Sequence, residues 1–258
     1  IFGKIEYSSD YTLNGGYENT GSITGNNNVG GLFGWSDQSA YKLTISGDSV
    51  NSGDVNGYDY VGGIGGYLRV KYLNISGAEN TGDVLAENSF AGGIVGYAGG
   101  YDYSSIISEC TSSASVSAKF IVGGLAGHAE NITLDSCDNE GSVITATGYR
   151  TEDNQNYVYL GGYAGSCGGV KNCINKAAIS YDGRGGRIGG IAGYAYNYGI
   201  FSGCENTAEI YAPNASYVGG VIGGVSNSSN VTLSKLTNSG KVTGSDNVGG
   251  IAGSINAT

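Results

Sequence analysis

The residues that could support catalysis or hold a metal are few and do not form a recognisable set. A Ser-His-Asp triad would have to use His128, the single histidine, and no Gly-x-Ser-x-Gly elbow surrounds a candidate serine. Asp54 and Asp83 occupy equivalent places in neighbouring repeats, but Ser115 and Ser142 follow them there, so we interpret both carboxylates as solvated. The His-Glu-x-x-His and Cys-x-x-Cys spacings are absent. The sequence therefore predicts no catalytic residues, no metal site and no cofactor.

Four of the five cysteines share one position in a repeating pattern. Cys110, Cys137, Cys173 and Cys204 each lie two residues before an asparagine or, in the first case, before a serine. The same position holds Tyr17, Ser49, Ala78 and Leu236 in the other repeats. A position that accepts Ala, Leu and Cys is typical of a small apolar interior site, so we expect stacked, buried, free thiols. Disulfides between neighbouring repeats are the alternative, and Cys167, outside this pattern, is the candidate for a reactive or bridging thiol.

Aromatic side chains are concentrated at two further positions of the repeat. One position holds Trp35, Tyr67, Tyr97, His128, Ser166, Tyr194, Gly224 and Ser254, and the other holds Asn28, Tyr60, Phe90, Ile121, Tyr159, Arg187, Tyr217 and Asn247. If both face outward, they form flat aromatic strips with polar edges, which suit sugar rings or protein partners. The alternative is that tyrosine fills these positions for its strand propensity. The candidate ligand-binding residues are Trp35, Tyr60, Tyr67, Phe90, Tyr97, Tyr159, Tyr194 and Tyr217.

A repeat that runs through the whole chain sets these spacings. Its most regular part is a six-residue Gly-Gly block, found at 29–34, 61–66, 91–96, 122–127, 160–165, 188–193, 218–223 and 248–253. The first glycines of successive blocks lie 32, 30, 31, 38, 28, 30 and 30 residues apart. Such a period is typical of stacked repeat folds. We interpret the paired glycines as packing residues that bend the chain, so that the apolar residues on both sides point inward.

Two other blocks indicate short strands. The second block ends in a β-branched residue in every repeat, which predicts an inward strand position: Ile23, Val55, Val84, Val116, Val143, Ile179, Ile210 and Val242. A third block alternates apolar residues with the spacing of two that strands show, as in Leu43 and Ile45. The sequence therefore predicts an all-β fold, a parallel β-helix or β-solenoid, with about eight coils of about 30 residues and three short strands each. The crossover rule for parallel strands predicts a right-handed coil.

Asparagine begins the second block in seven of the eight repeats, at Asn19, Asn51, Asn80, Asn139, Asn175, Asn206 and Asn238. Stacked asparagines can bond the amides of their neighbours, so we expect a structural ladder. The one long interval, residues 144–157 with Arg150, Glu152 and Asp153, predicts an inserted loop. Such a loop is either tolerated length variation or part of a binding site.

Composition narrows the range of possible functions and partners. The net charge of −10 over 258 residues argues against nucleic acids and anionic membrane surfaces, which need basic patches. No apolar run approaches the roughly 18 residues of a membrane span, so we expect no membrane insertion. Methionine is absent, and we expect residues 1–258 to be a single repeat domain cut from a longer chain. We expect a monomer.

The pairing of residues 238–242, Asn-Ser-Gly-Lys-Val, with residues 248–253, Val-Gly-Gly-Ile-Ala-Gly, resembles the GLUG motif repeat of bacterial surface proteins. The resemblance covers all eight repeats and is weakest at Ala114, Ala177 and Ala208, where a glycine is replaced. It implies an extracellular location, secreted or anchored to the wall of a bacterium, in an adhesin-like chain or an immunoglobulin A metallopeptidase. It brings no catalytic residue.

Three functional hypotheses follow. The first is a non-catalytic extracellular repeat module that acts as a stalk and adhesion surface, and binds a host glycan or protein at an aromatic strip. The second is an accessory substrate-recognition segment of a large secreted peptidase or glycosidase. The third, a solenoid hydrolase, requires three or more carboxylates that converge in one groove.

Overall fold

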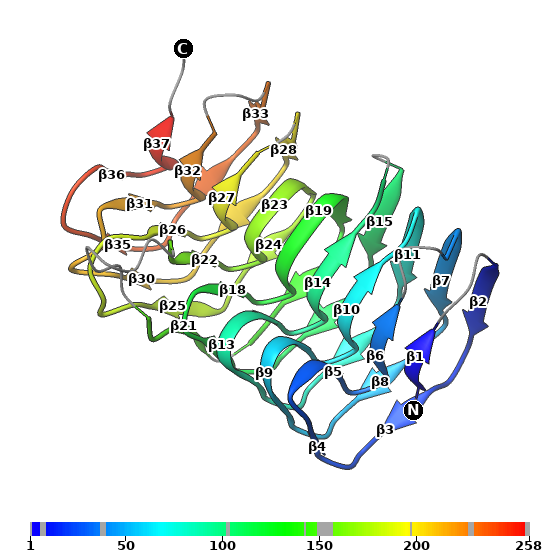
Figure 1. Ribbon diagram of the computed structural model, residues 1–258. Helices are drawn as coiled ribbons and strands as arrows, with labels where there is room; N and C mark the ends of the chain where they lie inside the picture. The colour runs from blue at the N-terminus through cyan, green and yellow to red at the C-terminus, as the bar shows by residue number, and fades with distance from the viewer. Residues whose placement is uncertain are drawn as a thin grey trace.

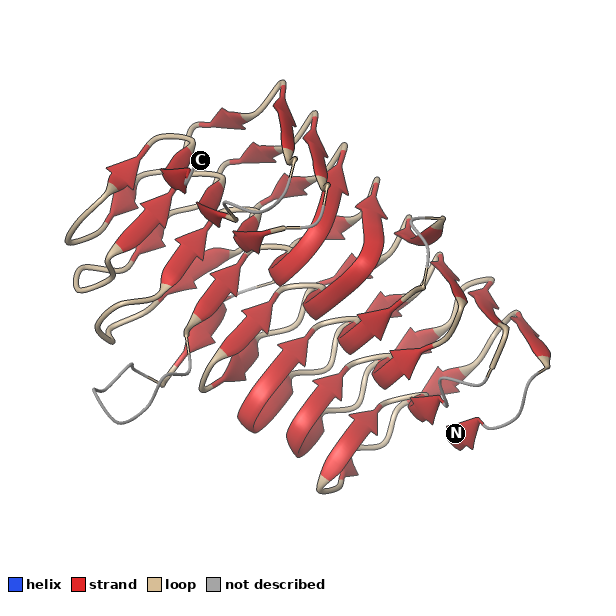
Figure 2. Cartoon of the chain, turned by 45° about the horizontal axis from the view of Figure 1, so that its top comes forward, coloured by secondary structure: helices blue, strands red, loops and turns tan. Residues whose placement is uncertain are grey.

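The computed structural model describes residues 2–5, 9–36, 40–101, 104–141, 143–148, 157–196, 198–226 and 230–255. Successive coils stack along one axis into an elongated rod, with the two termini at opposite ends (Figure 1). All regular structure in these residues is β-strand (Figure 2). Among them no helix is long and apolar enough to cross a membrane.

The described strands form three sheets that run the length of the rod. The largest has 15 strands: β1 (Phe2–Ile5), β2 (Asp10–Asn14), β6 (Phe33–Ser36), β7 (Lys42–Ser46), β10 (Gly65–Arg69), β11 (Tyr72–Ser76), β14 (Val95–Gly99), β15 (Ser105–Ser108), β19 (Ala126–Asp135), β23 (Ala164–Lys171), β27 (Ala192–Ala195), β28 (Ile200–Ser202), β32 (Ile222–Val225), β33 (Thr232–Ser234) and β37 (Ala252–Ile255). The smallest has 8 strands: β3 (Glu18–Asn19), β8 (Val50–Asn51), β12 (Glu79–Asn80), β16 (Thr111–Ser112), β20 (Asp138–Asn139), β24 (Ile174–Asn175), β29 (Glu205–Asn206) and β34 (Thr237–Asn238). The third has 14 strands: β4 (Ile23–Thr24), β5 (Asn27–Gly30), β9 (Val55–Gly62), β13 (Val84–Gly92), β17 (Val116–Ala118), β18 (Ile121–Gly123), β21 (Val143–Ala146), β22 (Tyr159–Gly161), β25 (Ala178–Ser180), β26 (Arg187–Gly189), β30 (Ile210–Tyr211), β31 (Tyr217–Gly219), β35 (Val242–Thr243) and β36 (Val248–Gly249).

Strands of successive coils pair in parallel and place equivalent residues opposite one another. In the Gly-Gly block Val29 pairs with Val61, which pairs with Ala91. In the third block Ile45 pairs with Ile75. The 8-stranded sheet follows the chain from β3 to β34, one strand for each coil. The predicted parallel β-solenoid is confirmed, and its right-handed direction stays a prediction.

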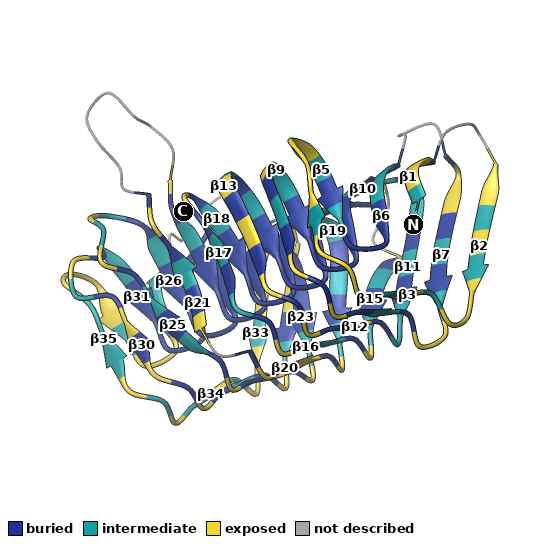
Figure 3. Cartoon of the chain, turned by 90° about the horizontal axis from the view of Figure 1, so that it is seen from below, coloured by how far each residue is buried: buried dark blue, intermediate teal, exposed yellow. Residues whose placement is uncertain are grey.

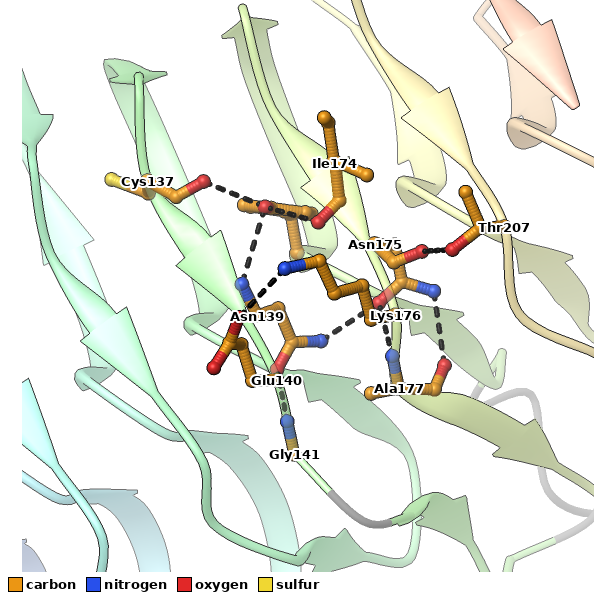
Figure 4. Close-up of polar contacts among 10 residues, drawn as sticks. Cys137, Asn139, Glu140, Gly141, Ile174, Asn175, Lys176, Ala177 and Thr207 are labelled. Atoms are coloured by element: carbon orange, nitrogen blue, oxygen red, sulfur yellow. Dashed lines mark hydrogen bonds and ion pairs between the residues drawn. The ribbon is translucent and has the colours of Figure 1, made fainter.

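The asparagine ladder consists of Asn19, Asn51, Asn80, Asn139, Asn175, Asn206 and Asn238, and hydrogen bonds connect its side chains from coil to coil. Asn139 Nδ2 donates to Asn175 Oδ1 over 2.9 Å (Figure 4). Asn175 Nδ2 also donates to the carbonyl of Ala177 over 3.0 Å, which closes the turn after the strand. Ser112 interrupts the ladder, and its buried Oγ has no hydrogen-bond partner. The predicted ladder is confirmed, with one gap.

The ladder and the paired glycines divide the interior of each coil into two apolar cores. Leu32 and Phe33 belong to the first core, and Val29, on the other side of the glycine pair, belongs to the second. Buried residues alternate with half-buried or exposed residues along strands such as β13, and exposed residues are also frequent at the turns (Figure 3). A Cβ atom on Gly162 would lie 2.5 Å from Asn175 Cγ, so the second glycine of the block leaves the space that the asparagine occupies.

The fifth coil departs from the predicted register by one residue. Ile144, rather than Val143, pairs with Ile179. Ile144 is 0% exposed and Val143 is 39% exposed. Asn139 lies one residue further from Ile144 than Asn175 lies from Ile179, and a shift of one residue in a strand moves side chains to the opposite face. The predicted inward position of Val143 is therefore wrong.

All five cysteines are buried free thiols. The four predicted to share a position lie in the first core, and each donates to the carbonyl two residues before it, as Cys173 does to Lys171 over 2.9 Å. The disulfide alternative is therefore not what the structure shows. Cys167 pairs with Ala129 and Ala195 in the neighbouring coils and burial raises the pKa of its thiol, so its assignment as a reactive or bridging cysteine is wrong.

The predicted insertion at 144–157 lies mostly outside the described residues. Residues 144–146 belong to β21, so the insertion begins later than predicted. Arg150, Glu152 and Asp153 are not among the described residues, and Tyr157 is the first residue described after them.

Candidate functional site

The Gly-Gly block turns each coil sharply, and the outer surface of this turn is concave. A Cβ atom on Gly96 would lie 2.5 Å from the carbonyl carbon of Tyr60 and 2.5 Å from the nitrogen of Val61 in the preceding coil. The outer faces of the strands before and after the block therefore approach each other. As a result, the rings of Tyr60 and Tyr67, which precede and follow the same block, have centroids 5.2 Å apart.

We call this surface the aromatic crease. It consists of side chains from both aromatic positions and their neighbours: Tyr60, Tyr67, Phe90, Tyr97, His128, Tyr157, Tyr159, Arg187, Tyr194, Tyr196 and Tyr217. All of them are half-buried except Tyr157, which is 37% exposed. The two predicted strips thus merge into one surface, because the turn brings them together.

In the first part of the crease, rings from successive coils stack. Tyr60 and Phe90 have centroids 4.8 Å apart, and Tyr67 and Tyr97 have centroids 4.7 Å apart. Tyr60 and Phe90 have φ values of 57° and 60°, which are rare for bulky residues and cost about 1–3 kcal/mol each. Asn28 and Asn247 hold the same position in other coils and have φ values of 56° and 47°, so this conformation belongs to the turn of the repeat.

An ion pair anchors the hydroxyl of Tyr97. This hydroxyl donates a short hydrogen bond to Glu130 Oε2, and Arg69 Nη2 lies 3.3 Å from the same oxygen. Burial, and then the bond to the carboxylate, raise the pKa of Tyr97. Tyr97 therefore stays neutral and is held in one orientation.

His128 connects the two parts of the crease. Its ring stacks between Tyr97 and Tyr196, at centroid distances of 4.9 Å and 5.6 Å. Its Nδ1 lies 2.7 Å from Ser166 Oγ and its Nε2 lies 3.0 Å from the Tyr196 hydroxyl. Burial lowers the pKa of His128 to about 4, so the ring is neutral near pH 7. Ser166 is 2% exposed, so its hydroxyl is enclosed.

The second part of the crease surrounds a guanidinium group. The carbon Cζ of Arg187 lies 4.7 Å from the ring centroid of Tyr194 and 5.1 Å from that of Tyr157. It lies 5.6 Å from the centroids of both Tyr159 and Tyr217. Arg187 is thus enclosed by four aromatic rings from three neighbouring coils, and cation–π attraction holds it there.

A hollow of about 350 Å³ lies beside the crease. Its walls are formed by Asp59, Asn88, Ser89, Phe90, Phe120, Ile121, Tyr157 and Tyr159. The Asp59 carboxylate accepts hydrogen bonds from Asn88 Nδ2 at 3.1 Å and from the Ser89 backbone nitrogen at 2.9 Å. The hollow combines aromatic walls with amide and hydroxyl groups, as small-molecule sites do.

The structure brings together seven of the eight predicted ligand-binding residues. The exception is Trp35, which pairs with Tyr67 in register but contacts Lys4, whose Nζ lies 4.7 Å from its ring. The sequence reasoning did not select His128, Tyr157, Arg187 and Tyr196 as site residues. Tyr196 could have been found from its spacing of two from Tyr194, which places both on one face of a strand.

Within the described residues, no three His, Cys, Asp or Glu side chains gather to hold a metal ion. The absence of catalysis and of a cofactor stays a prediction.

One family model matches part of the chain. Residues 88–117 match the model described as the GLUG motif. This segment is therefore similar to the GLUG motif, as the sequence predicts. It covers one coil, from Asn88 in β13 to Ser117 in β17, and includes the crease residues Phe90 and Tyr97. No curated protein matches the chain, and no solved structure matches it.

Proposed function

We propose that this chain is a non-catalytic, extracellular repeat module of a bacterial surface protein, which acts as a stalk and binds a glycan or protein ligand through the aromatic crease. The observation on which the proposal depends is the continuity of the crease. Its rings contact one another from Tyr60 in one coil to Tyr194 in another. A ligand longer than one sugar or one side chain can therefore lie along the rod axis.

The stalk role is supported by the way the coils hold together. Adjacent coils share parallel strand pairing in three sheets, and the asparagine ladder adds side-chain hydrogen bonds between coils. Each coil thus contacts its neighbours through all three sheets, as the repeats of a solenoid do. The GLUG motif is consistent with an extracellular repeat domain of a bacterium.

The ligand-binding role is supported by the chemistry of the crease. Half-exposed tyrosines offer flat apolar faces with a hydroxyl at one edge, and they lose little conformational entropy on binding. The anchoring of Tyr97 by Glu130 and of His128 by Ser166 and Tyr196 holds rings in place before a ligand arrives. A preorganised surface of this kind binds at a lower entropic cost.

The test is a screen of the protein against a glycan array and a panel of host proteins, with the double variant Tyr67→Ala/Tyr97→Ala beside the parent. Truncation of two rings at a binding surface costs roughly 2 kcal/mol or more, so we expect affinity to fall at least about tenfold. Tyr211→Ala is the matched control, because Tyr211 is 47% exposed and lies outside the crease. No binding by the parent, or equal binding by the double variant at an unchanged melting temperature, contradicts the proposal.

A further inference from the structure

Arg187 differs from three other cations on the rod, which are ion-paired. Arg69, Lys176 and Lys241 each lie within 4.0 Å of a carboxylate, at distances of 3.3, 2.6 and 3.1 Å. Arg187 has no carboxylate at that range among the described residues. Aromatic rings attract its charge but do not neutralise it. Arg187 is therefore a local site of positive charge in a chain whose net charge is −10.

The in-plane donors of Arg187 are mostly unused. A guanidinium group has five N–H donors in one plane. Within the described part of the chain, its side chain donates a single hydrogen bond, from Nη1 to the Tyr159 hydroxyl over 3.4 Å. The tyrosine rings attract the cation through their faces and leave the N–H groups at its edge available. A carboxylate is the partner that matches this planar fork, because it can accept two parallel hydrogen bonds.

Gly224 makes the space that Arg187 occupies. It takes the position that other coils fill with Trp35, Tyr67 or Tyr194. A Cβ atom on Gly224 would lie 2.6 Å from Arg187 Cδ and 2.8 Å from its Nε. The glycine therefore lets the aliphatic part of Arg187 lie flat against the sheet, which places the guanidinium among the rings.

The rings around Arg187 also form one wall of the hollow. Arg187 does not line the hollow itself, but Tyr157 and Tyr159 contact its guanidinium and line the hollow with Asn88 and Ser89. A sugar ring against these two tyrosines would therefore lie between the guanidinium and a space with aromatic walls and neutral polar atoms. The carboxylate of Asp59 in the same hollow already accepts hydrogen bonds from Asn88 and Ser89. Sugar hydroxyls are suited to hydrogen bonds with the polar groups at Asp59, Asn88 and Ser89, and a negative charge on the ligand is suited to the guanidinium.

We propose that the Arg187 part of the crease binds the carboxylate of an acidic saccharide, with its sugar ring against Tyr157 and Tyr159. This inference rests on the proposed ligand-binding role of the crease and names the class of ligand.

The experiment compares an acidic saccharide with the neutral saccharide to which its acidic sugar is attached: sialyllactose with lactose, and sulfated lactose as a third arm. A hydrogen-bonded charge pair strengthens binding, and half-exposure limits the gain, so we expect sialyllactose to bind about tenfold more tightly than lactose. Arg187→Gln should remove this preference, and Gly224→Ala should weaken it by displacing the side chain. Arg187→Lys keeps the charge and should retain part of the preference. Lys241→Gln changes the net charge equally outside the crease and should leave the preference intact.

Equal binding of sialyllactose and lactose by the parent overturns the inference, as does a preference that survives in Arg187→Gln. Stronger binding of sulfated lactose than of sialyllactose overturns the assignment to a carboxylate. If the parent binds a neutral saccharide or a protein, and Tyr67→Ala/Tyr97→Ala weakens that binding but Arg187→Gln does not, the inference fails and the proposed function stands. If the parent binds no saccharide and no protein, both fail.

Discussion

The gap in the asparagine ladder can be closed with one substitution, Ser112→Asn. In the parent, Asn80 Nδ2 donates to the carbonyl of Gly82 over 2.9 Å, and its second hydrogen has no ladder partner because Ser112 is too short. On the other side, Asn139 Oδ1 accepts a hydrogen bond from the Gly141 nitrogen at 3.3 Å and can accept another. An asparagine at position 112 would connect both, as Asn51, Asn175 and Asn206 connect the asparagines on their two sides.

The expected gain follows from these contacts. Two new amide hydrogen bonds contribute about 1 kcal/mol each, and the unpaired hydroxyl of Ser112 is removed. The loss of rotamer freedom in asparagine opposes this with roughly 1 kcal/mol. We expect a net stabilisation of about 1–2 kcal/mol, and a melting temperature raised by roughly 2–8 °C for a chain of this size.

The measurement is thermal and urea unfolding followed by circular dichroism. Ser113→Asn is the matched control, because Ser113 is the next residue and is exposed, so its asparagine has no ladder to join and should leave stability within about 0.5 kcal/mol of the parent. A Ser112→Asn protein no more stable than the Ser113→Asn protein would refute the account of the ladder. That result would show that the asparagine ladder is a consequence of coil stacking and does not itself add stability.

Two further predictions concern register and pH. Ile144→Asp should destabilise the protein by several kcal/mol, because it buries an unpaired charge. Val143→Asp should change stability by about 0.5 kcal/mol or less. Urea unfolding midpoints measure both, and a larger loss of stability in Val143→Asp than in Ile144→Asp would contradict the observed register. The pKa of His128 is lowered to about 4 from about 6.5 in an unfolded chain, so the unfolded state binds more protons between these values. Stability from this group is therefore complete above about pH 6.5 and is lost as the pH falls toward 4. Melting temperatures from pH 7 to 4 should fall less steeply in His128→Gln than in the parent, and parallel curves would count against a buried neutral imidazole.

Much of the fold could be predicted from spacing, and the errors have a clear cause. The prediction of buried cysteines is confirmed. Its basis is that Ala78 and Leu236 share their position in the repeat, because a position that accepts Ala, Leu and Cys is typical of an apolar interior. Val143 was wrong because one added residue in a turn moves a strand residue to the opposite face, and the neighbouring Ile144 has the same β-branched character. The sequence does not predict the role of Arg187, because its aromatic neighbours come from three coils.

The sequence alone determined the stacking of coils and the residues that lie above one another. The physical reason is that parallel, in-register strands place every residue beside its equivalent one repeat away, so periodicity along the chain becomes adjacency in space. The tertiary structure decided what lies opposite within a coil: that the ladder meets the second glycine of the block, that two aromatic positions converge in one crease, and that Arg187 lies over Gly224. The residues in these contacts are not separated by a multiple of the repeat, so periodicity does not place them together. The path of the chain around the coil decides how close they come.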